Sequence, residues 1–259
     1  MSMEPSETSP QTEGQGEKTA EPVTKKSSAS ATIVVAPDRV NPVYRRSHVL
    51  VKIATSMVGK LDIVGKENIP ATGGVILASN HRAHVDPPYL SLTTDRQIYF
   101  MAKEELFTTN AAFGRYLYGL GAFPVRRGES DRAALRMAIS LLKQGHVVAI
   151  FPEGTRSFDD SLLPPEKGFA LIAKQTGAPI VPIALEGTHR VLPKGTIFVH
   201  RGPVAITIGK PVTAKEILDA HQAAGKDALE IIGRDVMQRI ADLMRFSKAT
   251  VAPAEPTPI

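Results

Sequence analysis

From residue 60 onward, short apolar runs alternate with stretches of helical periodicity, and this alternation constrains the fold more than any other feature. Apolar runs of strand length between Gly or Pro residues are typical of buried strands, and apolar residues at i, i+4 and i+7 are typical of helices. The expected strands are residues 61–65, 74–79, 97–102, 121–125, 146–151 and 178–185, followed by a hairpin in 196–209. The expected helices begin at Pro87 or span residues 108–121, 129–144, 167–177 and 227–246. The pattern predicts an α/β fold in a single domain, with a mostly parallel mixed central sheet flanked by helices.

The two ends of the chain differ from this middle part. Residues 1–40 are rich in Ser, Thr, Pro, Glu and Gln and contain no aromatic residue, so we expect a disordered leader that buries too little apolar surface to fold. The leader has neither the basic start nor the long apolar stretch of a secretory signal. Residues 247–259 are expected to form a disordered tail, which leaves residues 60–246 as the folded domain.

Residues 41–59 are expected to form an amphipathic helix. Its apolar residues alternate with Arg45, Arg46, His48, Lys52 and Lys60. Such a helix either lies on an anionic bilayer or packs on its own domain. No run reaches the roughly 18 apolar residues of a membrane span.

The charge balance narrows the class of partner. The chain carries +5, and residues 1–40 carry −2 from four Lys/Arg and six Asp/Glu, so the remainder carries +7. A positive surface suits nucleic acid, an anionic membrane or a phosphorylated substrate. Nucleic acid is disfavoured, because there is no recognisable binding motif and no Trp. The absence of Cys excludes disulfides, thiolate metal sites and a cysteine nucleophile, and is consistent with a reducing cytoplasm.

One polar segment, "NHRAHVD" at 80–86, follows an apolar strand directly. His81 and Asp86 are five residues apart, which puts them about 140° apart on a helix and on opposite faces of a strand, so they can meet only across a turn. Pro87 and Pro88 fit the first turn of a helix, which makes the segment a strand-to-helix bend. Taken singly, Asp86 could equally be a helix N-cap and His81 a loop histidine.

Two further loops carry groups that suit an anion. In "FPEGTRS" at 151–157, Gly154 permits close backbone approach, Thr155 is a donor and Arg156 can bind phosphate through two hydrogen bonds. In "VRRG", Arg126 and Arg127 are candidates for the same anion. Each loop alone is as well explained by solvated surface charge. In α/β sheets, however, ligands gather where strands end, so these loops can converge on one crevice.

Together, these groups would suit a reaction at a hydroxyl. A neutral imidazole of His81 can take the hydroxyl proton, while a carboxylate on its other nitrogen fixes the tautomer and stabilises the imidazolium. There is no Gly-x-Ser-x-Gly elbow and no Cys, so direct attack by the substrate's own hydroxyl is the simpler mechanism.

The chain resembles the glycerolipid acyltransferases, in particular the bacterial 1-acyl-sn-glycerol-3-phosphate acyltransferases. "NHRAHVD" resembles their Asn-His-x-x-x-x-Asp motif, and "GAFPVRRG", "FPEGTRS" and "IVPIALEGT" resemble the second, third and fourth motifs, in the same order, over residues 60–210. The second motif departs from the family pattern, because Pro124 replaces a common aromatic residue and the arginine is doubled. Arg126 and Arg127 therefore both remain candidates for the phosphate-binding arginine, with Arg127 at the matching position.

The resemblance implies a glycerol-3-phosphate acyltransferase-like fold and an O-acyltransferase with His81 as general base and Asp86 as its orienting partner. Glu153, Gly154, Thr155 and Arg156 would form the acceptor site with the motif-two arginine. Pro182 would shape a loop that helps to admit the acyl donor, and Lys103 or nearby backbone N–H groups would stabilise the oxyanion.

The resemblance also implies the substrates and the surroundings of the enzyme. The acceptor would be lysophosphatidic acid, and acyl-CoA or acyl-carrier protein would be a substrate, with no metal or bound cofactor. The product would be phosphatidic acid for phospholipid synthesis, made at the cytoplasmic, inner face of the cell membrane by a peripherally associated protein.

Three alternatives remain at this point. A metal hydrolase could use His81, His84 and Asp86 as ligands, although their spacing matches no common zinc motif. A non-catalytic protein could bind anionic lipid through the same basic residues. An acyltransferase could act on another lysophospholipid or on a glycolipid. His84 is expected to be exposed.

Overall fold

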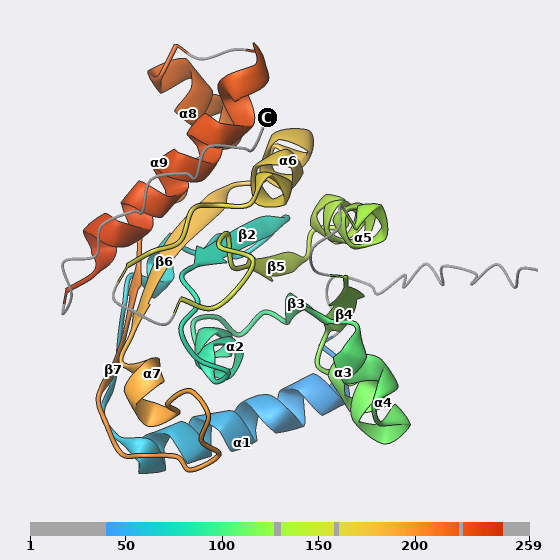
Figure 1. The fold of residues 1–259 in the computed structure, drawn as a ribbon, viewed down its shortest axis with the longest axis vertical. Helices are drawn as coiled ribbons and strands as arrows, with labels where there is room; N and C mark the ends of the chain where they lie inside the picture. Colours follow the sequence, from blue (N-terminus) through green and yellow to red (C-terminus); the bar gives the residue numbers. More distant parts are fainter. Residues whose placement is uncertain (1–39, 127–130, 158–160, 223–224, 246–259) are drawn as a thin grey trace, which may run out of the picture. The chain divides into compact units, whose positions relative to one another are not determined.

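The computed structural model describes residues 40–126, 131–157, 161–222 and 225–245 (Figure 1). The predictions of a disordered leader before residue 40 and a disordered tail at 247–259 lie outside the described residues, as does Arg127. The strands are β1 (Leu61–Val64), β2 (Val75–Ser79), β3 (Ile98–Lys103), β4 (Ala122–Val125), β5 (Val147–Ile150), β6 (Ile180–Glu186) and β7 (Val204–Ile208). The α-helices are α1 (Pro42–Val58), α2 (Asp86–Ser91), α3 (Glu105–Thr108), α4 (Ala111–Gly119), α5 (Arg132–Lys143), α6 (Lys167–Thr176), α7 (Thr188–Val191), α8 (Ala214–Ala220) and α9 (Ala228–Leu243).

The strands form one mixed sheet in the order β1-β7-β6-β2-β5-β3-β4, which confirms the predicted α/β fold. Only the β6/β7 pair within this sheet is antiparallel. Strand β2 is the central strand, and it pairs with β5 on one side and β6 on the other. The carboxyl ends of these three strands are therefore neighbours, and ligands of α/β sheets bind at such an edge.

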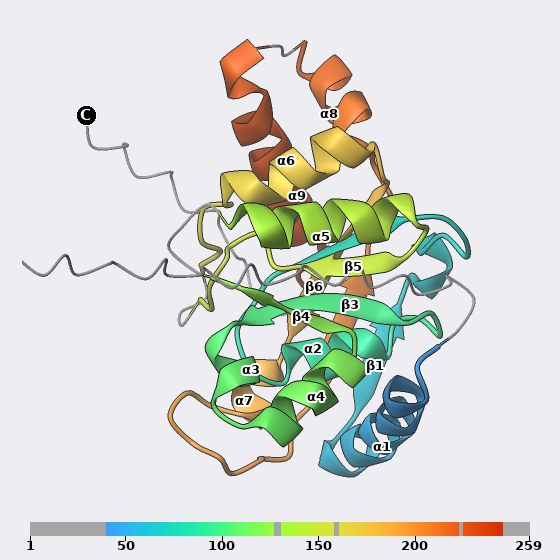
Figure 2. The same cartoon turned by 90° about the vertical axis from the view of Figure 1, so that its right-hand side faces the viewer.

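The sheet separates two apolar clusters because side chains of a strand alternate between its faces. In β2, Ile76 and Ala78 pack toward α5, α6, α8 and α9, whereas Val75 and Leu77 pack toward α2 and α7. Figure 2 shows the first group of helices above the sheet and the second, with α1, below it. Both faces of the central strand are thus covered, and all five of its residues are buried.

The prediction of a hairpin in residues 196–209 is wrong. Strand β7 pairs with β1 on one side and β6 on the other, so neither edge is open to residues 196–200, which form no strand. The sequence analysis also missed the short helices α3, α7 and α8. Helix α8 does carry a sequence signal, since Thr213 and Glu216 form a capping box at its start.

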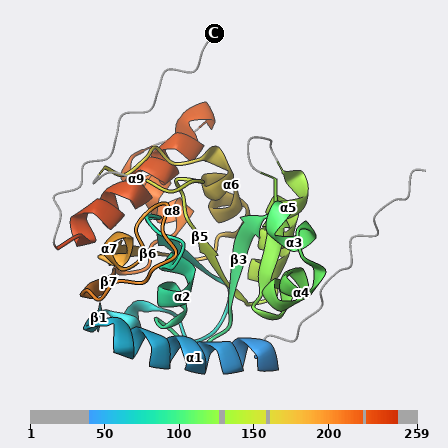
Figure 3. The ribbon, with the colours of Figure 1, turned by 60° about the horizontal axis from the view of Figure 1, so that its bottom comes forward.

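Helix α1 occupies the residues where an amphipathic helix was predicted, and it packs on its own domain. Tyr44 and Thr55 on its inner side are buried, and Ser47 on α1 hydrogen-bonds to Tyr116 on α4. Figure 3 shows α1 crossing beneath α2 and extending to α4. No helix in the described part of the chain is both long and apolar enough to traverse a bilayer.

Candidate active site

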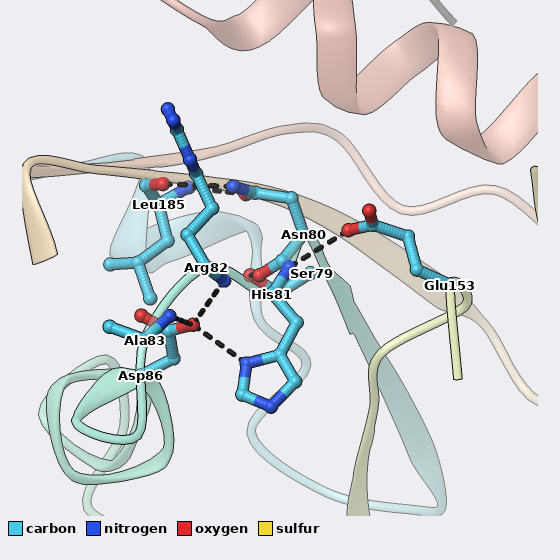
Figure 4. A network of polar contacts seen from close by, with 8 residues as sticks. All are labelled: Ser79, Asn80, His81, Arg82, Ala83, Asp86, Glu153 and Leu185. Atoms are coloured by element: carbon cyan, nitrogen blue, oxygen red, sulfur yellow. Dashed lines mark hydrogen bonds and ion pairs between the residues drawn. The ribbon is translucent and has the colours of Figure 1, made fainter. Parts of the chain in front are cut away.

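The site is built around a tight bend between β2 and α2. The Asn80 side chain anchors the end of β2, because its amide donates to Leu185 O at 2.9 Å and its oxygen accepts from Leu185 N at 2.8 Å. This side-chain amide thereby extends the pairing of β2 with β6 by one residue beyond the last strand position. His81 follows directly, and across the bend its Nδ1 lies 2.7 Å from Asp86 Oδ2 (Figure 4). The structure thus brings the two predicted catalytic residues together.

The Asp86 carboxylate holds the bend closed. It is completely buried, and Oδ2 accepts hydrogen bonds from Arg82 N at 2.6 Å and Ala83 N at 2.8 Å in addition to the contact with His81. Asp86 is not the helix N-cap considered above: it is the first residue of α2, and its side chain turns back to the preceding backbone. Three donors on one oxygen stabilise a negative charge that burial alone would disfavour.

The His81 ring is held from a second side by Phe151. The two rings are stacked with their centroids 4.0 Å apart and an interplanar angle of 16°. Because Oδ2 can only accept when Asp86 is ionised, Nδ1 carries the proton of a neutral His81 and Nε2 keeps its lone pair. In Figure 4 the second ring nitrogen points away from Asp86. This is the tautomer and orientation that a general base requires.

Glu153 links the end of β5 to the same bend. Its Oε1 accepts from His81 N at 2.9 Å and its Oε2 from Leu163 N at 2.9 Å, while Ser157 N donates to His81 O at 2.9 Å. The backbone of His81 is thereby fixed on both its N–H and its C=O. Glu153 was predicted to belong to the acceptor site. In the structure its carboxylate is buried, and both of its oxygens accept hydrogen bonds from backbone N–H groups.

Burial raises the pKa of Glu153 to about 7, although the hydrogen bonds from Leu163 and His81 act to lower it. Glu153 as a whole residue is only 3% exposed, so desolvation of its charge outweighs the two backbone donors. Asp86 adds a smaller repulsion in the same direction. Glu153 therefore changes its charge near neutral pH, next to the backbone of His81.

The remaining residues of the "FPEGTRS" loop lie nearer the surface. Gly154 adopts a φ of 64°, and a Cβ there would approach Glu166 Cγ to 2.8 Å, so the turn requires glycine. Its N–H donates to Phe151 O at 3.0 Å. Thr155 is exposed and Arg156 is half-buried, which leaves both side chains accessible at the loop.

Cationic groups surround His84, which is exposed as predicted. Partial burial of its ring lowers the pKa of His84, and the nearby charges of Arg156, His81 and Lys103 lower it further, while Asp86 raises it. Arg156 and Lys103, from the ends of β5 and β3, are thus close enough to act on one imidazole beside His81. One predicted anion-binding residue, Arg156, and the predicted oxyanion residue, Lys103, therefore lie at the same edge of the sheet as His81.

Arg126 and Pro182 lie elsewhere. Arg126 follows β4, and its exposed guanidinium pairs with Glu104, with Nε 2.8 Å from Oε2.

The prediction that Pro182 shapes a loop is wrong, because Pro182 is buried inside β6, opposite Ala78 of β2. The carbonyl oxygen of Pro182 accepts a hydrogen bond from Gly209 N at 2.8 Å. Because proline has no N–H to donate, the ladder of hydrogen bonds between β6 and β7 ends at Ile183 and Ile208.

Some site residues were missed by the sequence analysis. Asn80, Phe151 and Ser157 all occur within quoted motifs, but their contacts reach across the fold and no local pattern indicates them. Among the described residues, no three His, Asp or Glu side chains are arranged to hold a metal ion. The metal-hydrolase alternative therefore finds no site in that part of the chain.

A buried strand-to-helix bend that holds a histidine against a carboxylate, with arginine and lysine nearby, is an arrangement suited to an α/β enzyme that acts on a hydroxyl. Comparisons with known proteins agree. The profile of the family described as Acyltransferase matches residues 60–186. A 1-acyl-sn-glycerol-3-phosphate acyltransferase of Bacillus subtilis is 34% identical over 193 residues, which is 74% of this chain and 92% of the relative.

Further relatives extend the comparison to other bacteria and to structure. An acyltransferase of the same name from Streptococcus pneumoniae is 33% identical, with 70% of this chain and 66% of the relative covered. The crystal structure of the 1-acyl-sn-glycerophosphate (LPA) acyltransferase PlsC from Thermotoga maritima superimposes with a TM-score of 0.62 at 28% identity, covering 77% of this chain and 79% of that one. The chain therefore belongs to the acyltransferase family that includes these 1-acyl-sn-glycerol-3-phosphate acyltransferases.

Proposed function

We propose that the protein transfers a fatty acyl group from acyl-CoA or acyl-carrier protein to the free hydroxyl of 1-acyl-sn-glycerol 3-phosphate, giving phosphatidic acid. The observation that carries this proposal is the 2.7 Å contact between His81 Nδ1 and Asp86 Oδ2, which leaves Nε2 as a base. The names of the relatives supply the acceptor, since proteins 34% and 33% identical are 1-acyl-sn-glycerol-3-phosphate acyltransferases.

The reaction proceeds by direct attack. His81 Nε2 takes the proton of the acceptor hydroxyl as its oxygen bonds to the thioester carbonyl carbon, and Asp86 stabilises the resulting imidazolium. The tetrahedral intermediate then expels the thiolate, and the imidazolium returns the proton to the leaving sulfur. Lys103 or neighbouring backbone N–H groups stabilise the oxyanion. This sequence of steps balances without a metal ion or bound cofactor.

The phosphate of the acceptor binds to the cationic edge of the site. Arg156 and Thr155 contribute from the loop after β5, and the resemblance adds Arg127 from the segment after β4. Because the Arg126 guanidinium is already paired with Glu104, Arg127 is the stronger candidate for the arginine of this motif. Arg156 lies near His84 and thus near His81, which fits a short distance between the acceptor's phosphate and its reacting hydroxyl.

The protein attaches to the anionic inner face of the cell membrane through the outer side of α1. Leu50, Ile53 and Met57 are 66%, 54% and 68% exposed, and the buried Tyr44 and Thr55 lie on the opposite side of the helix. Arg45, Arg46 and Lys52 flank these apolar residues, and residues 41–61 contain no Asp or Glu. Apolar side chains flanked by basic residues are typical of helices that lie in the membrane interface. Flotation with anionic liposomes tests this attachment, because Leu50→Glu with Ile53→Glu should abolish it.

A thiol-release assay tests the enzymatic proposal. Palmitoyl-CoA is incubated with a thiol-reactive dye, with and without lysophosphatidic acid, and the protein adds no background because it contains no Cys. We expect release that depends on the acceptor and falls by about 10²–10⁴-fold in His81→Ala, the usual contribution of a general base. Release without acceptor would contradict acyl transfer and indicate a thioesterase. Absence of release with acyl-CoA, acyl-carrier protein and a panel of lysolipids would favour the lipid-binding alternative.

A further inference from the structure

The segment between α7 and β7 presents three consecutive large apolar side chains to solvent. Ile197, Phe198 and Val199 are 89%, 72% and 56% exposed. Three such side chains in a row are unusual on a water-facing surface, where apolar residues are normally scattered singly. This segment, residues 192–203, is called the apolar loop below.

The base of the apolar loop is fixed although its tip is exposed. His200 N donates to Val191 O at 2.8 Å, which closes the loop on the end of α7. Gly202 N donates to Val58 O at 3.2 Å, and Val204 N donates to Lys60 O at 2.9 Å, which ties the loop to the end of α1. The approach is close, since a Cβ at Gly59 would lie 2.3 Å from Gly202 O.

The base of the apolar loop and the end of α1 are therefore neighbours, although Val58 and Gly202 are far apart along the chain. In both Figures 1 and 2 the orange loop and the blue helix lie at the lower edge of the described residues. The exposed Met57 lies in the last turn of α1, next to the point where Val58 bonds to the loop. The exposed apolar residues of α1 and of the apolar loop thus both lie at the lower edge of the described residues in Figures 1 and 2.

The charge of the loop matches that of α1. Residues 187–203 contain Arg190, Lys194 and Arg201 but no Asp or Glu, and residues 41–61 also contain basic residues and no acidic ones. A protein partner would be met by mixed charges, whereas exposed apolar residues beside uniformly positive charge complement an anionic bilayer.

We propose that Ile197, Phe198 and Val199 insert into the anionic bilayer as a second anchor, separate from α1. The inference rests on the membrane attachment proposed above and adds a second contact to it. Two anchors held in fixed relation bind more strongly than either alone and define one orientation on the membrane. Because the apolar loop starts at α7, next to the end of β6, this orientation holds the carboxyl edge of the sheet at a set position relative to the lipid-borne acceptor.

Tryptophan fluorescence tests this proposal directly, because the chain contains no Trp. In Phe198→Trp the single indole should shift its emission to the blue when vesicles of phosphatidylcholine and phosphatidylglycerol are added, and lipids brominated on the acyl chain should quench it. The matched control is Val64→Trp, which places the indole at a 48% exposed apolar position on the edge strand β1. We expect no shift and no quenching there.

A second variant measures what the loop contributes to binding. Ile197→Ser with Phe198→Ser should lower the vesicle partition coefficient by about tenfold or more, because burial of one large apolar side chain is worth at least that factor. The thermal unfolding temperature should not change, because both side chains are exposed. Val64→Ser should partition as wild type does.

The outcomes separate the second anchor from the attachment through α1. If the Phe198→Trp variant floats with vesicles but its indole emission stays unchanged, the loop faces away from the bilayer and the proposal fails while α1 attachment stands. If neither wild type nor any variant floats, both fail. A blue shift without vesicles that grows with protein concentration would show that the loop binds a second copy of the chain, and would also overturn the proposal.

Discussion

The two sides of the candidate site are held in different ways. At the centre of the sheet, Asp86 and Glu153 are buried and accept hydrogen bonds from backbone N–H groups, and the buried His81 ring bonds to Asp86. At the edge formed by β3 and β4, the side chains of Arg126 and Glu104 are 66% and 40% exposed and form a surface ion pair. The half-buried Arg156 lies between these extremes.

The difference indicates that the central residues contribute a fixed geometry, whereas the residues at the edge contribute positive charge. A proton transfer requires a base within hydrogen-bond distance and in one tautomer, so the central groups are positioned before the substrate arrives. Binding a phosphate requires positive charge more than one fixed geometry, and exposed side chains can adjust to the ligand. Substitutions at the centre should therefore act on kcat and stability, and substitutions at the edge on KM.

The largest effect is expected for Asp86→Asn. Asparagine can place its oxygen where Oδ2 accepts from His81 Nδ1 and from the amides of Arg82 and Ala83, but it carries no negative charge to stabilise the imidazolium. We expect kcat to fall by about 10²–10⁴-fold, as for loss of the base itself, with little change in the KM for the acceptor. The thiol-release assay measures both constants.

The matched control for this substitution is Asp95→Asn, which neutralises an exposed aspartate outside the site. It should leave kcat unchanged. Near-normal turnover of Asp86→Asn would contradict the proposed difference between the centre and the edge of the site, because the central carboxylate would then be a structural group.

Glu153→Gln is expected to have the next largest effect, on the pH dependence of stability. The folded-state pKa of about 7 lies above the ordinary value of 4.5, so the folded protein keeps this proton where the unfolded chain loses it. The stabilising contribution is complete below pH 4.5 and is lost as the pH rises through 7, a change of roughly 2–3 kcal/mol. The measurement is urea unfolding of wild type and Glu153→Gln between pH 4.5 and 8.

The difference between the two pH profiles isolates Glu153, because all other titrating groups are shared. Wild type should lose stability across this range relative to the variant, and the exposed Glu166→Gln should follow wild type. Parallel profiles for wild type and Glu153→Gln would mean that the backbone amides, and not burial, dominate the charge state of this carboxyl.

Arg156→Ala is expected to change substrate binding rather than turnover. Loss of a hydrogen bond to a charged phosphate costs roughly 1.5–3 kcal/mol, so the KM for lysophosphatidic acid should rise about 10–100-fold with a small change in kcat. Salt should reduce the difference between wild type and variant. Arg234→Ala, an exposed position on α9, is the control. An equal loss in kcat with an unchanged KM would place Arg156 among the positioning groups of the centre.

The same difference explains what the sequence could predict. The His81–Asp86 pair was predictable because a strand, five residues and two prolines determine a local bend. The anchors of that bend were not, since Glu153 contacts His81 across 72 positions and Asn80 contacts Leu185 across 105. The predicted hairpin failed for a related reason: strand pairing is non-local, and both edges of β7 are taken by β1 and β6. The loop-shaping role of Pro182 came from the resemblance alone, although the apolar pattern of residues 178–185 predicted the strand in which Pro182 lies.

Arg126→Ala is expected to have the smallest effect, and it tests the edge of the site most closely. The Arg126 side chain is 66% exposed and its partner Glu104 40%, and such pairs contribute about 0–1 kcal/mol to stability. Because Glu104 already occupies the guanidinium, the KM for the acceptor should rise by less than about threefold, within that same energy range, whereas Arg127→Ala should raise it by more. The decisive comparison uses Glu104→Gln, which removes the ion pair with Glu104 and keeps the Arg126 side chain. If Arg126 binds the phosphate, Glu104→Gln lowers KM and Arg126→Ala cancels that gain; if Arg127 alone binds it, Glu104→Gln leaves KM unchanged.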